Sequence, residues 1–208
     1  MLCTSDTSQE RIFLDRVITC DEKWVSYVNR KRSPRWLDKN EAPKHCPKAP
    51  LHPRKTLLTV WWHVHRIIKY FLLPVNKTIT TETYCEYIQE IHEKLKIRRP
   101  ALVNGQGPIL LHEKARPRTS PLTVMTLNEL GFEILQHPPY SLDLSPTDFH
   151  LFKHLGHFLS GKTFTNIPDL EHSINIFIDS QKSDFFQKRH LLICGSLAEV
   201  YRCRWSLF

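Results

Sequence analysis

The sequence lacks the features that mark membrane proteins, secreted proteins and disulfide-stabilised proteins. No apolar run reaches the roughly eighteen residues that a membrane-spanning helix needs, so no membrane partner is expected. The first residues carry no basic stretch followed by an apolar one, so no secretion signal is expected. The six cysteines include no Cys-x-x-Cys pair, which indicates free thiols in a reducing compartment and argues against a disulfide framework or a zinc site.

What the sequence does contain is an apolar fraction that suits a folded domain and an excess of basic residues. The 208 residues fit one domain, or one domain with a small appendage, and the 41% of apolar residues are enough for a core. The formal charge of +8 favours a polyanionic partner, although a solvated basic surface explains the composition equally well. Residues 1–12 are polar and are expected to be disordered or frayed, which leaves residues 13–208 for the domain.

The order of the expected elements indicates an α/β domain. Strands are predicted from apolar and β-branched runs at residues 16–20, 56–62, 66–73, 108–112 and 132–135. Helices are predicted from apolar residues at helical spacing at 81–96, 121–130 and 168–180, and a further helix should begin at Ser145. Strands first, followed by alternating helices and strands, fit a mixed sheet with helices on both faces.

A basic, proline-rich segment separates the first two predicted strands. Residues 29–56 hold a cluster of cations at Arg30, Lys31, Arg32 and Arg35, followed by four prolines. The segment is too long for an ordinary hairpin turn. We therefore expect an exposed loop whose four clustered cations contact a polyanion.

Three acidic residues occupy the ends of predicted elements. Glu113 follows the wholly apolar run 108–112, which is typical of a central strand covered on both faces. Asp148 lies at the start of an amphipathic helix, and Asp21 continues the face of the first strand that carries Val17 and Thr19. A single acid is more often a solvated surface group, so the surrounding motifs must decide whether these residues form a site.

The segments around the three acids resemble the catalytic core of the mariner transposases, of the Tc1/mariner superfamily. The family sequence His-Asp-Asn-Ala-Arg-Pro-His appears as His-Glu-Lys-Ala-Arg-Pro-Arg at residues 112–118. The family's Pro-Tyr-Ser-Pro-Asp-Leu segment corresponds to the start of residues 139–152, and its Asp-Glu-Lys-Trp is found unchanged at residues 21–24. Thirty-four residues lie between Glu113 and Asp148, as between the second and third acids of the family.

The resemblance implies a ribonuclease-H-like fold of the DDE/D transposase and integrase type, with a metal-dependent active site. Asp21, Glu113 and Asp148 would be its catalytic residues and metal ligands. The implied cofactor is Mg²⁺ or Mn²⁺, because hard divalent cations prefer oxygen ligands. Two such ions, about 3.5–4 Å apart, can stabilise the attacking and leaving oxygens of a phosphodiester.

The resemblance also implies a partner and a location. The partner would be DNA, contacted by Arg116 and Arg118 as well as by Arg30, Lys31, Arg32 and Arg35. The 29–56 segment resembles the family's clamp loop, which reaches across a dimer, so a homodimer through this loop is expected. The implied location is the nucleus.

The sequence departs from the family pattern within the site. The replacements are Glu113 for Asp, Lys114 for Asn, Arg118 for His and Leu142 for Pro, with further changes in residues 185–208. The family's N-terminal helix-turn-helix modules have no counterpart in the sequence. Two classes of function therefore remain open. One is a truncated, diverged transposase domain with weakened metal-dependent cleavage and strand transfer, and the other is a non-catalytic module for DNA binding or dimerisation.

Two further patterns have structural interpretations. His150, His154 and His157 share one helix at a spacing that suits zinc, but no cysteine or additional histidine completes a set of ligands. A partly buried helix face is the preferred interpretation.

Trp61 and Trp62 point to opposite faces of a predicted strand, so one should lie in the core and the other beneath a helix or against a partner.

Overall fold

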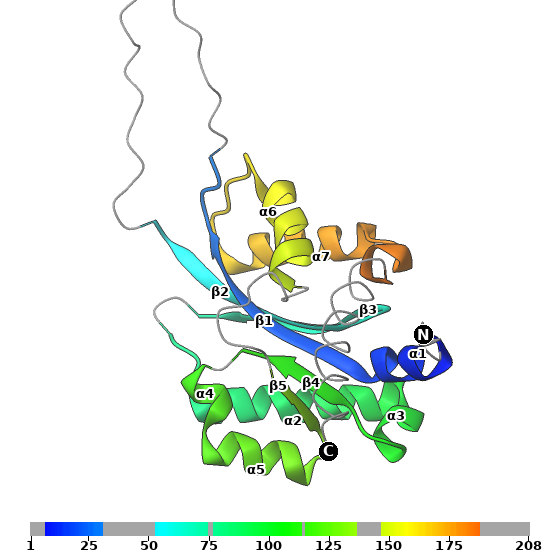
Figure 1. Cartoon of the computed structure of the whole chain (residues 1–208). Helices are drawn as coiled ribbons and strands as arrows, with labels where there is room; N and C mark the ends of the chain where they lie inside the picture. The colour runs from blue at the N-terminus through cyan, green and yellow to red at the C-terminus, as the bar shows by residue number, and fades with distance from the viewer. Residues whose placement is uncertain (1–6, 31–52, 75–76, 114, 137–146, 188–208) are drawn as a thin grey trace, which may run out of the picture.

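The centre of the protein is a five-stranded mixed sheet (Figure 1). The computed structural model describes residues 7–30, 53–74, 77–113, 115–136 and 147–187. The strands are β1 Val17–Ser26, β2 Lys55–His63, β3 Arg66–Leu73, β4 Ile109–His112 and β5 Glu133–Gln136, in the spatial order β3-β2-β1-β4-β5. β1 pairs antiparallel with β2, and β2 with β3, whereas β4 runs parallel to both β1 and β5. This topology confirms the predicted ribonuclease-H-like α/β fold.

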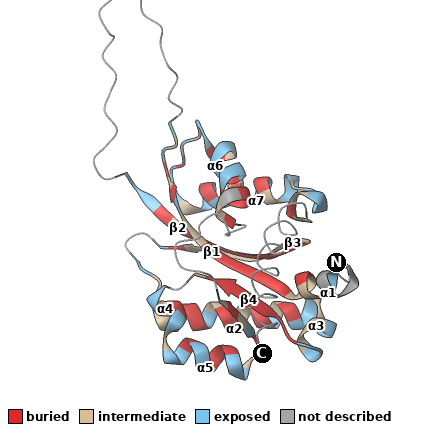
Figure 2. Cartoon of the chain, viewed as in Figure 1, coloured by how far each residue is buried: buried red, intermediate tan, exposed pale blue. Residues whose placement is uncertain are grey.

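Helices cover both faces of the sheet. They are α1 Thr7–Arg16, α2 Thr81–Arg98, α3 Pro100–Asn104, α4 Arg116–Thr119, α5 Pro121–Glu129, the π-helix η2 Thr147–Phe152, α6 Lys153–Leu159 and α7 Ile167–Ser180. Helices α2 and α5 pack on one face, and η2, α6 and α7 on the other. The buried residues follow the strands and the inward sides of these helices (Figure 2). None of the described helices is long and apolar enough to cross a membrane.

The helix ends follow from local sequence chemistry. The side chains of Thr80 and Ser120 accept hydrogen bonds from the backbone N–H groups of the residues three positions later, at 3.3 and 3.2 Å, and so cap α2 and α5. Gly131, just after α5, has a φ of 71°, a conformation that glycine adopts without strain. These caps set the helix boundaries that the sequence predicts to within two residues.

The two adjacent tryptophans of β2 connect the two halves of the core. Both are fully buried. Trp61 faces α2 and stacks on Tyr84 with 5.7 Å between ring centroids, whereas Trp62 belongs to the core beneath α6 and α7. The expectation that the two side chains serve opposite faces is confirmed, and both lie in the core beneath helices, Trp61 beneath α2 and Trp62 beneath α6 and α7.

The structure differs from the sequence-based expectations at several elements. Residues 7–12, expected to be frayed, belong to α1, because this helix packs Leu14 into a small core with Val17 of β1. The short helices α3 and α4 were not expected, and the helix predicted to begin at Ser145 is described from Thr147 and starts as a π-helix. The predictions for residues 1–6, for Lys31, Arg32, Arg35 and most of the 29–56 loop, and for residues 188–208 lie outside the described residues.

Candidate metal centre

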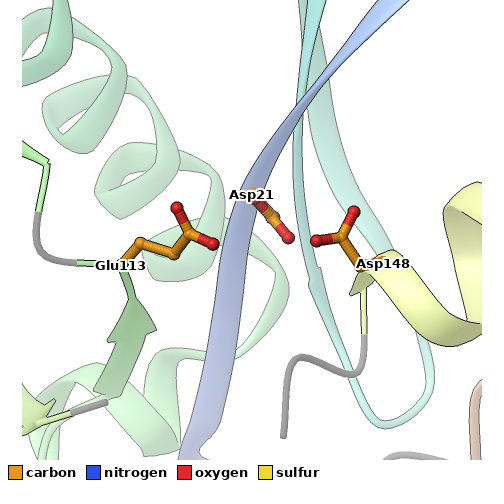
Figure 3. Close-up of side chains that lie close together, drawn as sticks. All are labelled: Asp21, Glu113 and Asp148. Carbon is orange, nitrogen blue, oxygen red and sulfur yellow. The ribbon is translucent and has the colours of Figure 1, made fainter. Parts of the chain in front are cut away.

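Three carboxylates from separate parts of the chain converge beside the central strand (Figure 3). One oxygen of Asp21, one of Glu113 and one of Asp148 all lie within 4.8 Å of one another. Asp21 is buried, whereas Glu113 and Asp148 are partly exposed, so the cluster can be reached from solvent past these two residues. The convergence expected from the sequence is therefore present in the structure.

The strand register explains why Asp21 and Glu113 meet. β1 and β4 are parallel neighbours, and Thr19 pairs with Leu111. Asp21 and Glu113 each lie two residues beyond this pair, so they fall at the same level of the sheet. β4 is apolar except for its last residue, His112, and is buried along its full length, which fixes the point from which the Glu113 side chain extends.

Asp148 reaches the cluster from the opposite side, on η2. The preceding residue, Thr147, is buried, and its Oγ1 accepts a hydrogen bond of 3.0 Å from Nε1 of Trp62. Phe152, at the end of η2, is fully buried in the core beneath α6 and α7. Both ends of η2 are thus attached to the sheet core, and this attachment orients Asp148 toward β1. Single-turn π-helical segments are frequent at functional sites.

The electrostatics of the cluster favour a cation. The pKa of Asp21 is raised to about 7, mainly by burial and also by the neighbouring carboxylates of Asp148 and Glu113, against the opposing effects of a hydrogen bond from the Glu22 backbone N–H and of Arg118. That N–H lies 2.7 Å from Oδ1 of Asp21. Three carboxylates so close together repel one another, and a divalent cation would relieve this repulsion. The donor set consists of hard oxygen ligands, which suits Mg²⁺ or Mn²⁺.

Arg118, expected from the sequence to contact DNA, is instead part of the support beneath the cluster. Its side chain is only 3% exposed, and its Nη2 lies 2.7 Å from Oε1 of Glu22. The guanidinium also lies over the ring of Tyr84, 5.9 Å from the ring centroid. This burial and this ion pair were not predicted, because the partner of Arg118 is 96 positions away in the sequence, and they give the expected DNA contact of Arg118 no support. Arg116, on the same short helix, is exposed, as is Arg30.

A second polar contact stabilises the base of the Glu113 side chain. The Tyr84 hydroxyl lies 2.8 Å from Nδ1 of His112, the residue before Glu113, and both side chains are buried. Burial lowers the pKa of His112 to about 4, so this imidazole is neutral at physiological pH. Tyr84 thus contacts both Arg118 and His112, and this connection was not predicted from the sequence.

The histidines of the following helix do not form a metal site. His150 is buried, its Nε2 donates to the Phe185 carbonyl oxygen at 2.7 Å, and its ring packs against that of Phe185. Nδ1 of His154 donates to the His150 carbonyl oxygen at 2.7 Å. Within the part of the chain that the structure describes, the acidic triad is the only group of three or more potential ligands placed to share a cation. The packing interpretation fits the buried His150, whereas His154 and His157 are exposed.

Comparisons with known proteins agree with this site. Residues 26–104 match the family model described as transposase (partial DDE domain). The chain is 53% identical over 196 residues to the human histone-lysine N-methyltransferase SETMAR, and 30% identical over 179 residues to the Mariner Mos1 transposase of Drosophila mauritiana. These alignments cover 94% and 86% of the chain, but 29% and 52% of the two relatives, so the chain spans about half of Mos1 or less than a third of SETMAR.

Solved structures of Mos1 show the same architecture. The Mos1 catalytic domain superposes with a TM-score of 0.74 at 27% identity, over 92% of this chain and 83% of that one. The Mos1 paired-end complex with the left transposon end gives a TM-score of 0.82 at 28% identity, over 92% of this chain and 56% of that one. A Mos1 paired end complex with Mn gives the same score, identity and coverage.

Proposed function

Because the chain belongs to the mariner transposase family as a catalytic DDE domain, we propose that it binds DNA and cleaves phosphodiester bonds with divalent cations held by its acidic triad. The observation that carries this proposal is the convergence of Asp21, Glu113 and Asp148 within 4.8 Å. Such spacing allows cations to be shared between carboxylates, whereas three solvated surface acids would lie apart.

Each acid has a distinct part in this proposal. Asp21 lies between the other two (Figure 3) and is held by the backbone N–H of Glu22, so it would serve as the shared ligand. Glu113 and Asp148 would complete the coordination from the two sides. Bound Mg²⁺ or Mn²⁺, two ions in the full form of the proposal, supplies Lewis-acid activation of a water or hydroxyl nucleophile. The residues themselves would orient the cations, with the buried Asp21 on the β1 side.

Glu113 is the feature that would weaken the activity. It keeps the charge and both oxygens of the family's aspartate, but its side chain is one methylene longer. Because catalytic groups need placement within about 0.5 Å, the longer side chain must bend to present its oxygens correctly. We therefore propose slow cleavage and strand transfer. A non-catalytic DNA-binding or dimerising module is the second candidate, favoured by the substitutions Glu113 and Lys114 in the same motif.

The DNA partner is supported by charge and by relatives. The chain carries +8 at neutral pH, and Mos1 has been solved in paired-end complexes with its transposon end. We propose that Arg30, Lys31, Arg32, Arg35 and the exposed Arg116 contact DNA phosphates, that residues 29–56 support a homodimer, and that the protein acts in the nucleus.

A nicking assay tests the proposed function. Supercoiled plasmid is incubated with the full chain and either Mg²⁺, Mn²⁺ or EDTA, and the relaxed product is quantified. We expect cation-dependent nicking that Asp21→Ala abolishes. The matched control is Glu129→Gln, which removes an exposed acid of α5 far from the triad and should leave nicking unchanged. Absence of nicking with retained DNA binding would support the non-catalytic module instead.

A further inference from the structure

A basic cavity lies away from the acidic triad, at the turn of the β2–β3 hairpin. It has a volume of about 320 Å³ and is lined by His63, His65, Arg66, Ile68, Leu95, Arg98 and Arg99. Along β2, Val60 pairs with Asp21 whereas His63 pairs with Ile18, so the cavity begins three residues, or about 10 Å, beyond the level of the triad. Its apolar residues Ile68 and Leu95 belong to the core beneath α2, on the face opposite η2. The cavity is therefore separate from the proposed metal centre.

The lining of the cavity is strongly cationic. Three of its seven residues are arginines, two are histidines and none is acidic. Nη1 of Arg98 donates to the Ile68 carbonyl oxygen at 3.4 Å, and Nη1 of Arg99 donates to the Asp15 carbonyl oxygen at 2.8 Å. These bonds to neutral backbone groups orient the guanidinium groups without cancelling their charge. Among the described residues, neither these two arginines nor Arg66 has a carboxylate partner.

Two sources of negative charge near the cavity, among the described residues, are the carboxylate of Asp15 and the C-terminus of α2. Oδ1 of Asp15 lies 3.1 Å from Nε2 of His65, so it is already engaged by a residue of the wall. The C-terminus of α2 carries partial negative charge, but the backbone N–H of Arg99 caps the Leu95 carbonyl oxygen at 2.7 Å. Three full positive charges outweigh these contributions, so the cavity favours an anion.

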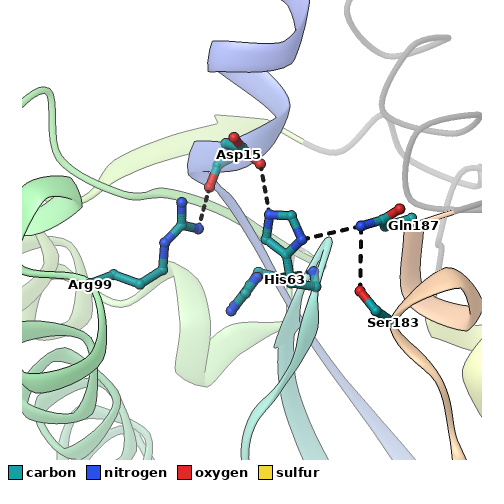
Figure 4. Close-up of polar contacts among 6 residues, drawn as sticks. Asp15, His63, Arg99, Ser183 and Gln187 are labelled. Carbon is teal, nitrogen blue, oxygen red and sulfur yellow. Dashed lines mark hydrogen bonds and ion pairs between the residues drawn. The ribbon is translucent and has the colours of Figure 1, made fainter.

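The wall of the cavity is built before any ligand arrives. Asp15 of α1 and Gln187 approach the β2–β3 hairpin from two sides (Figure 4). Nε2 of Gln187 lies 3.4 Å from Nδ1 of His65 and 3.4 Å from Oγ of Ser183. The backbone N–H of His65 also donates to Nδ1 of the buried His63, at 3.1 Å. Segments from the start, middle and end of the described chain thus hold His65 in place, and such preorganisation lowers the entropic cost of binding.

We propose that this cavity binds a phosphate group. Arginine presents planar, fixed donors that match phosphate oxygens in pairs, and three arginines on a half-buried cavity provide several such pairs. The volume exceeds that of a single phosphate, and the apolar floor of Ile68 and Leu95 suits the sugar attached to it. The phosphate belongs either to a nucleic-acid backbone or to a free mononucleotide. The first source rests on the proposed DNA partner, whereas the second does not.

Calorimetric titration of the full chain with three probes tests this proposal. The probes are inorganic phosphate, a deoxymononucleotide and a six-nucleotide single strand. Arg66→Gln and Arg98→Gln should each weaken binding of at least one probe by about tenfold, because each removes charge-assisted hydrogen bonds. Both residues are exposed, so these variants should fold. Lys162→Gln, which removes one positive charge on the opposite face of the sheet, is the matched control. It should leave the affinity for all three probes unchanged.

Arg98→Lys separates a built site from general electrostatic attraction. This substitution keeps the positive charge but loses the paired donors of the guanidinium. If the site is as proposed, the affinity for the probes should fall about as much as with Arg98→Gln. If the Gln variants lose affinity only for the oligonucleotide, the cavity binds a DNA backbone. If they lose affinity for the mononucleotide or inorganic phosphate, the cavity binds a free ligand. Unchanged affinity for all three probes in both Gln variants, or full retention in Arg98→Lys, would overturn the proposal. Cation-dependent nicking that persists in these variants would leave the proposed function intact.

Discussion

Arg118 and Glu22 form a buried ion pair directly beneath the acidic triad. Nη2 of Arg118 lies 2.7 Å from Oε1 of Glu22, with the two side chains 3% and 22% exposed. Glu22 follows Asp21 on β1, and Arg118 lies five residues after Glu113, on α4. The pair therefore links the segments that present two of the three acids, and it explains how a short loop after β4 can hold a fixed position relative to β1.

The first prediction concerns the stability that this pair provides. Arg118→Gln should lower the free energy of unfolding by about 3 kcal/mol, because it leaves Glu22 without its charged partner in a largely buried setting. Urea unfolding followed by circular dichroism measures the change. Arg116→Gln, on the exposed side of the same helix, is the control and should stay within about 0.5 kcal/mol of the parent. A loss below 1 kcal/mol for Arg118→Gln would show that the pair does not hold α4 to β1.

The second prediction concerns pH and the carboxyl of Asp21. Its pKa is raised from 3.8 to about 7, mainly by burial, so the folded protein binds more protons than the unfolded chain between these values. Stability in EDTA should therefore fall as the pH rises from about 4 to about 7, by at most about 1.4 kcal/mol for each unit of the interval. Asp21→Asn has no charge to desolvate and should remove this contribution.

The comparison of parent and Asp21→Asn at pH 5 and pH 8, by urea unfolding in EDTA, checks this sign. The variant should be more stable than the parent at both pH values, and its gain should be larger at pH 8 than at pH 5, where only part of the interval from 3.8 to about 7 has been crossed. Saturating Mg²⁺ at pH 8 should stabilise the parent and leave the variant almost unaffected, because ligand binding to the folded state stabilises it. Equal pH dependence in the two proteins would contradict the assignment of the raised pKa to Asp21.

The third prediction concerns the length of the second acid. Restoring the family residues with Glu113→Asp and Lys114→Asn should raise cation-dependent nicking at least tenfold, since a misplacement near 1 Å can cost about a hundredfold. Plasmid nicking under single-turnover conditions is the measurement, and Glu113→Gln is the inactive reference. An unchanged rate in the double variant would show that side-chain length and the adjacent cation are not what limits cleavage.

The fourth prediction concerns the basic segment. DNA affinity should depend less on salt when Arg30, Lys31, Arg32 and Arg35 are neutralised together. The slope of the logarithm of affinity against the logarithm of salt concentration should become shallower by up to about four units, close to one for each phosphate contact that is lost. Fluorescence anisotropy with a labelled duplex measures the slope. The control neutralises four lysines elsewhere, namely Lys94, Lys96, Lys162 and Lys182. If both sets flatten the slope equally, the 29–56 segment has no special part in binding.

The sequence predicts the parts of this protein that depend on local pattern or on motif order. The five strands and the longer helices follow from apolar periodicity, and the meeting of Asp21 with Glu113 follows from the register of two neighbouring parallel strands. The buried state of Arg118 could not be predicted, because a cation in a short motif is usually exposed and its partner Glu22 is distant in sequence. The π-helical start of the Asp148 helix likewise could not be predicted, and the hydrogen bond from Trp62 to Thr147 at this start joins residues that are distant in sequence.

We propose above that Asp21, Glu113 and Asp148 together hold divalent cations. Anomalous diffraction from crystals of the full chain grown with saturating Mn²⁺ is the most direct test. We expect anomalous peaks coordinated by oxygens of all three acids, and their loss in Asp148→Asn crystals. A well-ordered protein with no anomalous peak at the triad, or with Mn²⁺ held by other residues while the triad stays free, would contradict it.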